Sequence, residues 1–208
     1  MKKTIIAILI VAILAMTLVA CGDFTKSDKT IYDTLNDLVA LDYQRVSLEV
    51  QTTMNGVTLV NNFTSNRGES NTVVTYSVQE LATFDQMADS DNYVIPTDMI
   101  VTKRGSATIK DGVVIEQNGD SVNISVESLQ NLSVKFKGEY FTMAHETYEG
   151  GADVFKANVT NVKGFTGNQN FTGTDMTVIV RYKDALKSII IDYVSANGAN
   201  VKVIYTFG

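Results

Sequence analysis

Apolar and polar residues alternate with a period of two along much of the chain after residue 45. Leu48 and Val50 alternate with the polar residues 47, 49 and 51, as expected for a strand with one buried face. Asn55-Gly56 comes next and is typical of a two-residue hairpin turn. A hairpin closed at this turn places Met54 opposite Val57, Thr52 opposite Leu59 and Leu48 opposite Phe63. The sequence therefore predicts a hairpin in this register, because a shift by one residue would mix its apolar and polar faces.

The same alternation predicts further antiparallel strands. They cover residues 71–81, 140–147, 152–160, 175–182, 186–194 and 201–207. Asp111-Gly112 and Asn118-Gly119 predict the turns of a three-strand meander, which would place Val113, Ile115, Val122 and Ile124 on one face. Residues 83–104 are expected to form a crossover or a flap, residues 125–132 a short helical turn and residues 163–174 a long loop.

The segment from Thr30 to Leu41 predicts one amphipathic helix. Ile31, Leu35, Leu38 and Val39 fall on a single helical face. The expected fold class is therefore mostly β (α+β). We expect a curved antiparallel sheet or half-barrel that packs on this N-terminal helix and on short helical segments, in one domain over residues 30–208.

The first 21 residues have the pattern of an export signal. Lys2 and Lys3 precede an apolar stretch that ends in Leu18-Val19-Ala20-Cys21, which contains the only cysteine of the chain. This tetrapeptide resembles the lipobox of bacterial lipoproteins. The resemblance implies that residues 1–20 are a signal peptide cleaved after Ala20, and that Cys21 carries diacylglycerol and the chain fatty acyl groups such as palmitate. Residues 21–29 would then form an acylated tether.

The lipobox implies a location on the extracytoplasmic face of the cell membrane, with the membrane as a partner through Cys21. Two acyl chains are enough for stable anchoring. The alternative is an uncleaved signal-anchor helix with an incidental cysteine, although the apolar stretch is shorter than the roughly 20 residues that a spanning helix needs.

Charge and motifs exclude several functions. Removal of Lys2 and Lys3 leaves 15 basic against 23 acidic residues, a net charge of −8, which argues against a nucleic-acid partner. The single histidine, His145, is in phase with Phe141 and Met143 in a predicted strand, which is more typical of a sheet residue than of a catalyst. Asp89-Ser90-Asp91 is better interpreted as a solvated acidic turn than as a calcium loop. We therefore expect no catalytic residue, no metal site, no cofactor and no enzymatic activity.

The order of elements, an acylated tether, a helix and a long antiparallel meander, resembles the LolA/LppX-like group of envelope lipoproteins from about Thr30 to Phe207. The resemblance implies a curved sheet that wraps helices and encloses an acyl chain, and it identifies no ligand-binding residue. The first hypothesis is thus a non-catalytic binding module for a lipid or other amphiphile. The alternative is a surface interaction or structural lipoprotein with a filled core, which would bind a protein or envelope polymer through loops such as residues 163–174. An envelope hydrolase is a third class, and it would require two carboxylates with shifted pKa values.

Tyrosines are frequent in or beside the predicted strands. They are Tyr76, Tyr93, Tyr140, Tyr148, Tyr182, Tyr193 and Tyr205. They could line a concavity that binds an amphiphile or a glycan, or they could serve ordinary sheet packing, which is the more common use of strand aromatics.

Overall fold

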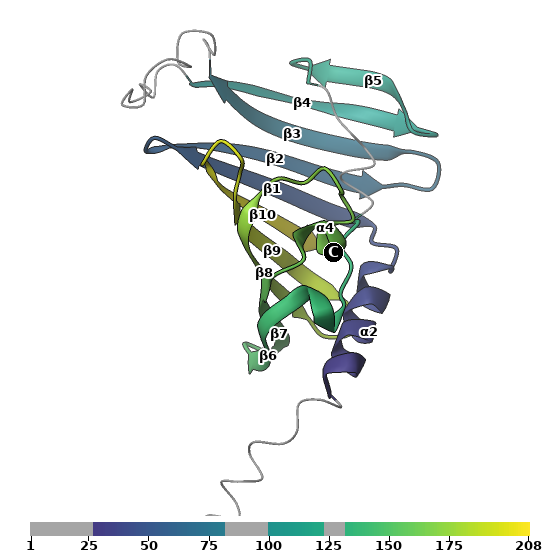
Figure 1. The fold of residues 1–208 in the computed structure, drawn as a ribbon. Helices are drawn as coiled ribbons and strands as arrows, with labels where there is room; N and C mark the ends of the chain where they lie inside the picture. The colour runs from purple at the N-terminus through teal and green to yellow at the C-terminus, as the bar shows by residue number, and fades with distance from the viewer. Residues whose placement is uncertain (1–26, 82–99, 123–131) are drawn as a thin grey trace, which may run out of the picture.

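The computed structural model describes residues 27–81, 100–122 and 132–208, with side chains from Ile31 onward, and its main feature is one curved, open, antiparallel sheet of ten strands (Figure 1). The strands are β1 (Arg45–Met54), β2 (Val57–Arg67), β3 (Thr72–Leu81), β4 (Ile100–Lys110), β5 (Val113–Gly119), β6 (Phe141–Glu149), β7 (Ala152–Val159), β8 (Thr174–Tyr182), β9 (Leu186–Val194) and β10 (Asn200–Phe207). The predicted mostly-β class with a curved antiparallel sheet is confirmed.

The sheet consists of two meanders that meet at one non-sequential pair. Its strand order is β5-β4-β3-β2-β1-β10-β9-β8-β7-β6. Among the described strands, β1 and β10 are the one pair of neighbours that are not consecutive in the sequence. We call β1–β5 the N-terminal half-sheet and β6–β10 the C-terminal half-sheet. Eight residue pairs, from Val46 with Phe207 to Thr53 with Asn200, join the two halves.

The predicted register of the first hairpin is confirmed. Met54 pairs with Val57, and the pairing continues to Leu48 opposite Phe63. Asn55 and Gly56 both have positive φ angles, 50° and 79°, which the two-residue turn with a matching twist requires.

Helical segments cover the C-terminal half-sheet. Helix α2 (Ser27–Val39) lies against it in Figure 1, together with the short helices η2 (Gly138–Tyr140) and α4 (Val162–Thr166). Leu35 is fully buried and Leu38 nearly so, which confirms the predicted apolar face of the N-terminal helix. We call the face of the sheet that bears α2 the inner face.

Phenylalanine rings fill the layer between the helices and the C-terminal half-sheet. Phe136, Phe141, Phe155 and Phe165 contact one another with ring centroids 5.5–6.0 Å apart. Tyr32 of α2 stacks on Phe141 at 5.7 Å. Close contacts of this kind exclude water and bury large apolar areas, so this layer is the main core of the molecule.

A polar link fixes residues 132–137 against α2. The side-chain amide of Asn36 donates to the carbonyl of Phe136 at 2.8 Å, and its oxygen accepts from the Phe136 amide at 2.9 Å. Both backbone groups of Phe136 are thus satisfied in the absence of a neighbouring strand, which allows its ring to enter the core.

Three predictions about connections are wrong. Residues 100–104, expected in a crossover or a flap, form the first half of β4, where Val101 pairs with Glu80. Asn118-Gly119 is not a two-residue turn, because both residues are paired within β5, with Ser106 and Gly105, and the strand ends at Gly119. Phe165, expected in a loop, lies in α4 and is fully buried. Residues 83–99 and 123–131, with Asp89, Tyr93 and Ile124, lie outside the described residues.

Two bulges change which side chains share a face. A register shift on β6 separates Thr142 from His145, so Phe141 pairs with Val159 while His145 pairs with Lys156, on the opposite face of β7. The predicted phase of His145 with Phe141 is therefore wrong, and the exposed His145 is confirmed as a sheet residue. A second shift, on β4–β5 at Thr108/Ile109, interrupts the pairing at Ile115 and breaks the predicted apolar alternation.

Candidate binding site

The inner face of β1–β4 is largely apolar, and its outer face is largely polar. The inner residues include Leu48, Val50, Met54, Val57, Leu59, Phe63, Val74, Tyr76, Val78, Val101, Ala107 and Ile109. The outer residues include Ser47, Glu49, Gln51, Thr53, Thr58, Asn62, Thr64, Thr75, Ser77 and Gln79. Because the register is continuous through β1 and β10, this apolar face extends the one that the helices cover on the C-terminal half-sheet.

Burial along this face changes from one end to the other. Val74 is fully buried and Ile109 nearly so, and Leu48 and Phe63 pack on them as a small second cluster. Toward the other end Val57 is still buried, but Leu59 and Val78 are only half-buried, and Val101 is 42% exposed. Apolar side chains at this end thus retain surface that a ligand could cover.

An ion pair lies at the more exposed end of this face. The Nζ atom of Lys103 lies 2.6 Å from Oε1 of Glu80, and both side chains remain partly exposed. Lys103 pairs with Val78 and Glu80 pairs with Val101, so the two charges stand among apolar neighbours. The inner face therefore has a charged end beside an apolar surface.

Tyr76 attaches the edge strand β5 to the sheet. Its hydroxyl donates to the carbonyl of Asp120 and accepts from the Gln117 amide at 3.1 Å. Its ring lies over Gly105, where the methyl group of an alanine would collide with the Tyr76 hydroxyl. Gly105 is thus needed for the ring to reach β5.

One small gap lies between the C-terminal end of α2 and the sheet. It has a volume of about 30 Å³, and Val39, Tyr43, Tyr205 and Phe207 are among the residues that line it. This is about the room that one water molecule needs. Acyl-chain binding is therefore better accommodated on the inner face of the N-terminal half-sheet than beneath α2.

Most described tyrosines serve packing. Tyr76, Tyr140 and Tyr182 are buried, whereas Tyr148 is 69% exposed. Tyr193 and Tyr205 are half-buried on the inner face, and burial raises the pKa of each phenol; the nearby Tyr193 raises that of Tyr205 further. A phenol is protonated at neutral pH in any case, and the raised pKa values keep both hydroxyls protonated to more alkaline pH.

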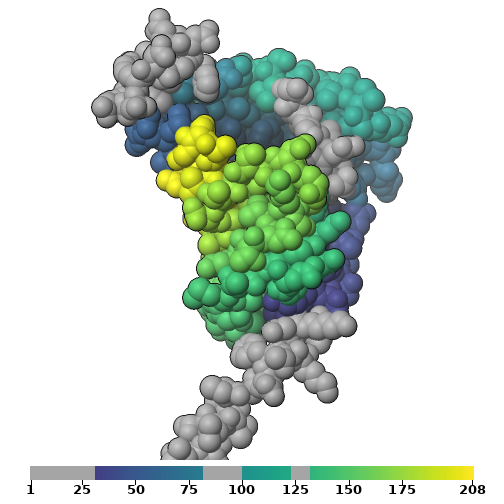
Figure 2. Space-filling view, viewed as in Figure 1, coloured from purple at the N-terminus to yellow at the C-terminus, as the bar shows by residue number. Residues whose placement is uncertain are grey.

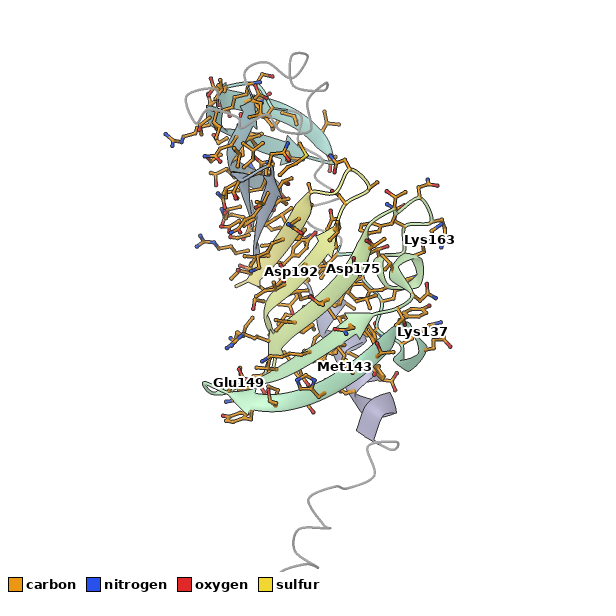
Figure 3. All side chains as sticks on the ribbon, turned by 60° about the vertical axis from the view of Figure 1, so that its left-hand side comes forward. Lys137, Met143, Glu149, Lys163, Asp175 and Asp192 are labelled. Atoms are coloured by element: carbon orange, nitrogen blue, oxygen red, sulfur yellow. The ribbon has the colours of Figure 1, made fainter. Side chains whose placement is uncertain are left out.

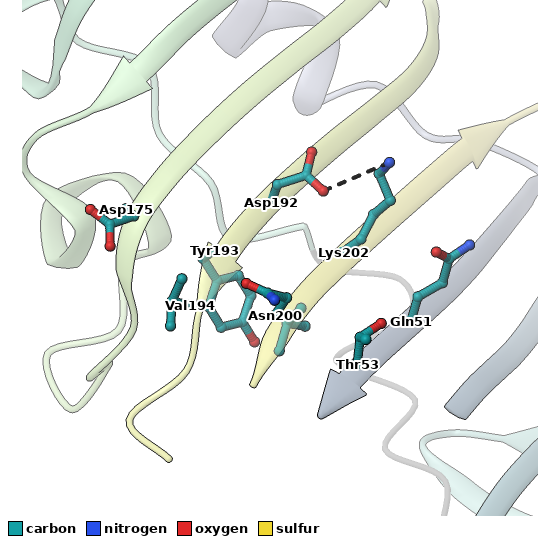
Figure 4. Close-up of a pocket in the computed structure, with 9 residues that line it drawn as sticks. Gln51, Thr53, Asp175, Asp192, Tyr193, Val194, Asn200 and Lys202 are labelled. Atoms are coloured by element: carbon teal, nitrogen blue, oxygen red, sulfur yellow. Dashed lines mark ion pairs between the residues drawn. The ribbon is translucent and has the colours of Figure 1, made fainter. Parts of the chain in front are cut away.

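A second, polar depression lies at the ends of β1, β8, β9 and β10 (Figure 4). It has a volume of about 330 Å³, and Gln51, Thr53, Asp175, Asp192, Tyr193, Val194, Asn200, Val201 and Lys202 line it. Several of its polar groups already have partners: Lys202 lies 3.8 Å from Asp192 within the depression, and Gln51 and Thr53 bond to Glu49 and Thr58 outside it. Its lining is largely polar, and several of its polar groups are already paired, so it is the weaker candidate for binding an amphiphile.

The described carboxylates give little support to the hydrolase hypothesis. The pKa of Glu149 is lowered, first by its hydrogen bonds from Lys156 and Thr147 and then by the charges of Lys156 and Arg181. A general acid needs the opposite shift. Figure 3 shows Glu149 at the end of the edge strand β6, which also carries Met143. Among the described residues, no group of three or more His, Cys, Asp or Glu side chains is arranged to hold a metal ion.

The lipobox residues Leu18, Val19, Ala20 and Cys21 lie outside the described residues. Within the described ranges, no helix combines the length and the apolar character that crossing a membrane demands. Sequence reasoning did not identify Glu80 or Lys103 as site residues, although it named Tyr76 among the tyrosines that could line a binding concavity. The period-two pattern does contain a signal for Glu80 and Lys103, because both charged residues occupy positions at which the alternation places apolar side chains.

No protein-family model matches the sequence, and no curated protein matches it. Among solved structures, one match is to a DUF1329 family protein from Desulfovibrio piger, which is 13% identical. The likeness covers 86% of this chain and 91% of the other, at a TM-score of 0.26. A likeness at this level establishes neither a family nor an activity.

Proposed function

We propose that this chain is a lipid-anchored protein of the extracytoplasmic membrane face that acts as a non-catalytic binding module. In this proposal, the inner face of β1–β4 holds the apolar part of a lipid or another amphiphile. The observation that carries it is the half-exposed apolar surface around Leu59, Val78 and Val101, which continues a fully packed core. Burial of such surface contributes about 25 cal/mol per Å² removed from water.

The membrane part of the proposal rests on the lipobox at residues 18–21. Wild-type cells grown with radiolabelled palmitate should yield a labelled protein in the membrane fraction, because acylation at Cys21 supplies the anchor. The Cys21→Ser variant should be unlabelled and should leave that fraction after a salt wash. An unlabelled wild-type chain, or a variant held as firmly as wild type, would contradict the anchor.

The binding part is tested with the mature chain, residues 21–208 carrying Cys21→Ser, by native mass spectrometry after incubation with lipid vesicles. Leu59 and Val60 are adjacent, half-buried and on opposite faces of β2. We expect Leu59→Gln to lose bound lipid, because it places an amide on the proposed surface, and Val60→Gln to retain it. Equal loss in both variants, or no lipid on the wild-type chain, would refute binding at this face.

The filled core beneath α2 favours a second candidate, a surface interaction lipoprotein. In this hypothesis the aromatic layer is a rigid platform, and exposed loops such as residues 167–173 contact a protein or an envelope polymer. Crosslinking in intact cells should then recover a specific protein partner, and substitutions in that loop should abolish the crosslink while Leu59→Gln leaves it intact.

A further inference from the structure

Charged residues are rare on the inner face of β1–β4. The register places three there: Arg67 at one end of the face, and Glu80 and Lys103 toward the other. Arg67 pairs with Asp42, in the connection between α2 and β1. The Glu80–Lys103 pair therefore stands alone among the described charges at the more exposed end of the apolar surface.

The apolar path from this pair is long enough for a lipid tail. Lys103 and Ile109 are six residues apart on β4, which corresponds to about 20 Å at the usual rise per strand residue. Tyr76, Val74 and Ala107 lie on the same face between them. A tail could thus follow the strands while its head group stays at the charged end.

The pair can exchange partners. Lys103 and Glu80 are 36% and 45% exposed, and an ion pair with that much solvent contact is weak. An anionic head group would be attracted to Lys103 but repelled by Glu80. A cationic head group would be attracted to Glu80 but repelled by Lys103. A head group that carries both a phosphate and an ammonium satisfies both charges, with phosphate on Lys103 and ammonium on Glu80.

We infer that the inner face selects amphiphiles with a zwitterionic head group, in which a phosphate and an amine flank the Lys103–Glu80 pair. This inference rests on the proposed function, because it assigns the ligand class of the same site. It adds a prediction that lipid binding alone does not make: each charge removed should change the preferred head group in its own direction.

The test uses the mature chain with Cys21→Ser and three lipids that share one fluorescent acyl chain. They are phosphatidylcholine (zwitterionic), phosphatidylglycerol (anionic) and diacylglycerol (uncharged). Titrations should show that the chain binds phosphatidylcholine about tenfold more tightly than the other two, because two partly exposed charge contacts together contribute a factor of this order.

Glu80→Gln should shift the preference toward phosphatidylglycerol, since only Lys103 remains. Lys103→Met should abolish the advantage of phosphatidylcholine over diacylglycerol. Asp192→Asn and Lys202→Met are the matched controls, because Asp192 and Lys202 form a similarly exposed ion pair on the outer face; both should keep the wild-type order.

The outcomes separate the two proposals. Failure of all three lipids to bind would overturn the proposed function and this inference with it. Binding of all three with equal affinity, or a preference that neither Glu80→Gln nor Lys103→Met changes, would overturn the head-group assignment while leaving amphiphile binding in place.

Discussion

The two half-sheets are built from the same alternating pattern but differ in what covers their inner faces. In the C-terminal half-sheet, Phe155, Val180 and Ile189 are essentially inaccessible, because Phe136, Phe165 and α2 lie over them. In the N-terminal half-sheet, Val74 and Ile109 form only a small buried cluster. Figure 2 shows the C-terminal strands and helices as a solid body above which the N-terminal strands extend.

This difference shows that strand alternation determines which face is apolar, while segments outside the strands determine whether that face is filled. Residues 132–137 and η2 precede β6, and α4 connects β7 to β8. These segments supply the aromatic rings that fill the layer over the C-terminal half-sheet. A rigid, filled half beside a half-exposed one is an arrangement that suits binding, since the filled half can hold the register of the other through β1 and β10.

The largest loss of stability should come from a substitution that removes a core side chain of the C-terminal half-sheet. Phe155→Ala removes a buried ring that contacts Tyr32, Phe136 and Phe141, and should lower the free energy of unfolding by about 3–5 kcal/mol. Phe63→Ala, at a partly buried position in the N-terminal half-sheet, should cost less, because less of that ring leaves water on folding. Urea unfolding of the two variants measures the difference.

Equal costs for Phe155→Ala and Phe63→Ala would show that the N-terminal half-sheet is as fully packed as its partner. The comparison, and the candidate site with it, would then be wrong.

A smaller effect, confined to the N-terminal half-sheet, is expected from Gly105→Ala. The added methyl group would collide with the Tyr76 ring and with the Asn118 carbonyl, so the hydroxyl of Tyr76 should lose Asp120. Overpacking of this kind costs about 1–3 kcal/mol. Amide hydrogen exchange should accelerate along β5 and remain at the wild-type rate in β7–β9.

Tyr76→Phe should accelerate exchange along β5 less than Gly105→Ala does, since it removes only the hydroxyl and keeps the ring over Gly105. Exchange that accelerates throughout the sheet in either variant would show that the two halves unfold together, rather than as regions of different stability.

Local sequence patterns were sufficient where the decisive interactions are local. The Asn55-Gly56 turn fixed the register from Met54–Val57 to Leu48–Phe63, and the pattern of Leu35 and Leu38 indicated the buried face of α2. Asn161 and Gly167 are a helix signal that the loop prediction overlooked: the Asn161 side chain accepts from the Gly164 amide, and Gly167 adopts a left-handed conformation after α4.

Other features depend on contacts between distant segments, which alternation does not encode. The pairing of β1 with β10 joins residues about 150 positions apart. The bulge at Met143, whose φ of 52° is uncommon for a residue with a side chain, reverses the face of His145 without any glycine to mark it. Whether an apolar face is filled or open depends on Phe136 and Phe165, and neither lies in a strand.

The smallest expected effect concerns alkaline pH and again separates the two halves. The pKa of Tyr182, in the filled half, is raised well above its usual value, first by burial and then by its hydrogen bond to Glu146 and the charges of Glu146 and Asp153. The unfolded chain therefore loses this proton at lower pH than the folded one, so the contribution of Tyr182 to stability is complete below about pH 10 and declines above it. Tyr182→Phe should cost about 1 kcal/mol at neutral pH, the usual value of one hydrogen bond, and should flatten the decline in unfolding free energy above pH 10. Urea titrations at several pH values measure both.

Tyr193 of β9 and Tyr205 of β10 also have raised pKa values. As the pH rises, amide hydrogen exchange should therefore lose protection first in β8–β10. An earlier loss of protection in β3–β5 would contradict the assignment of the alkaline instability to these tyrosines.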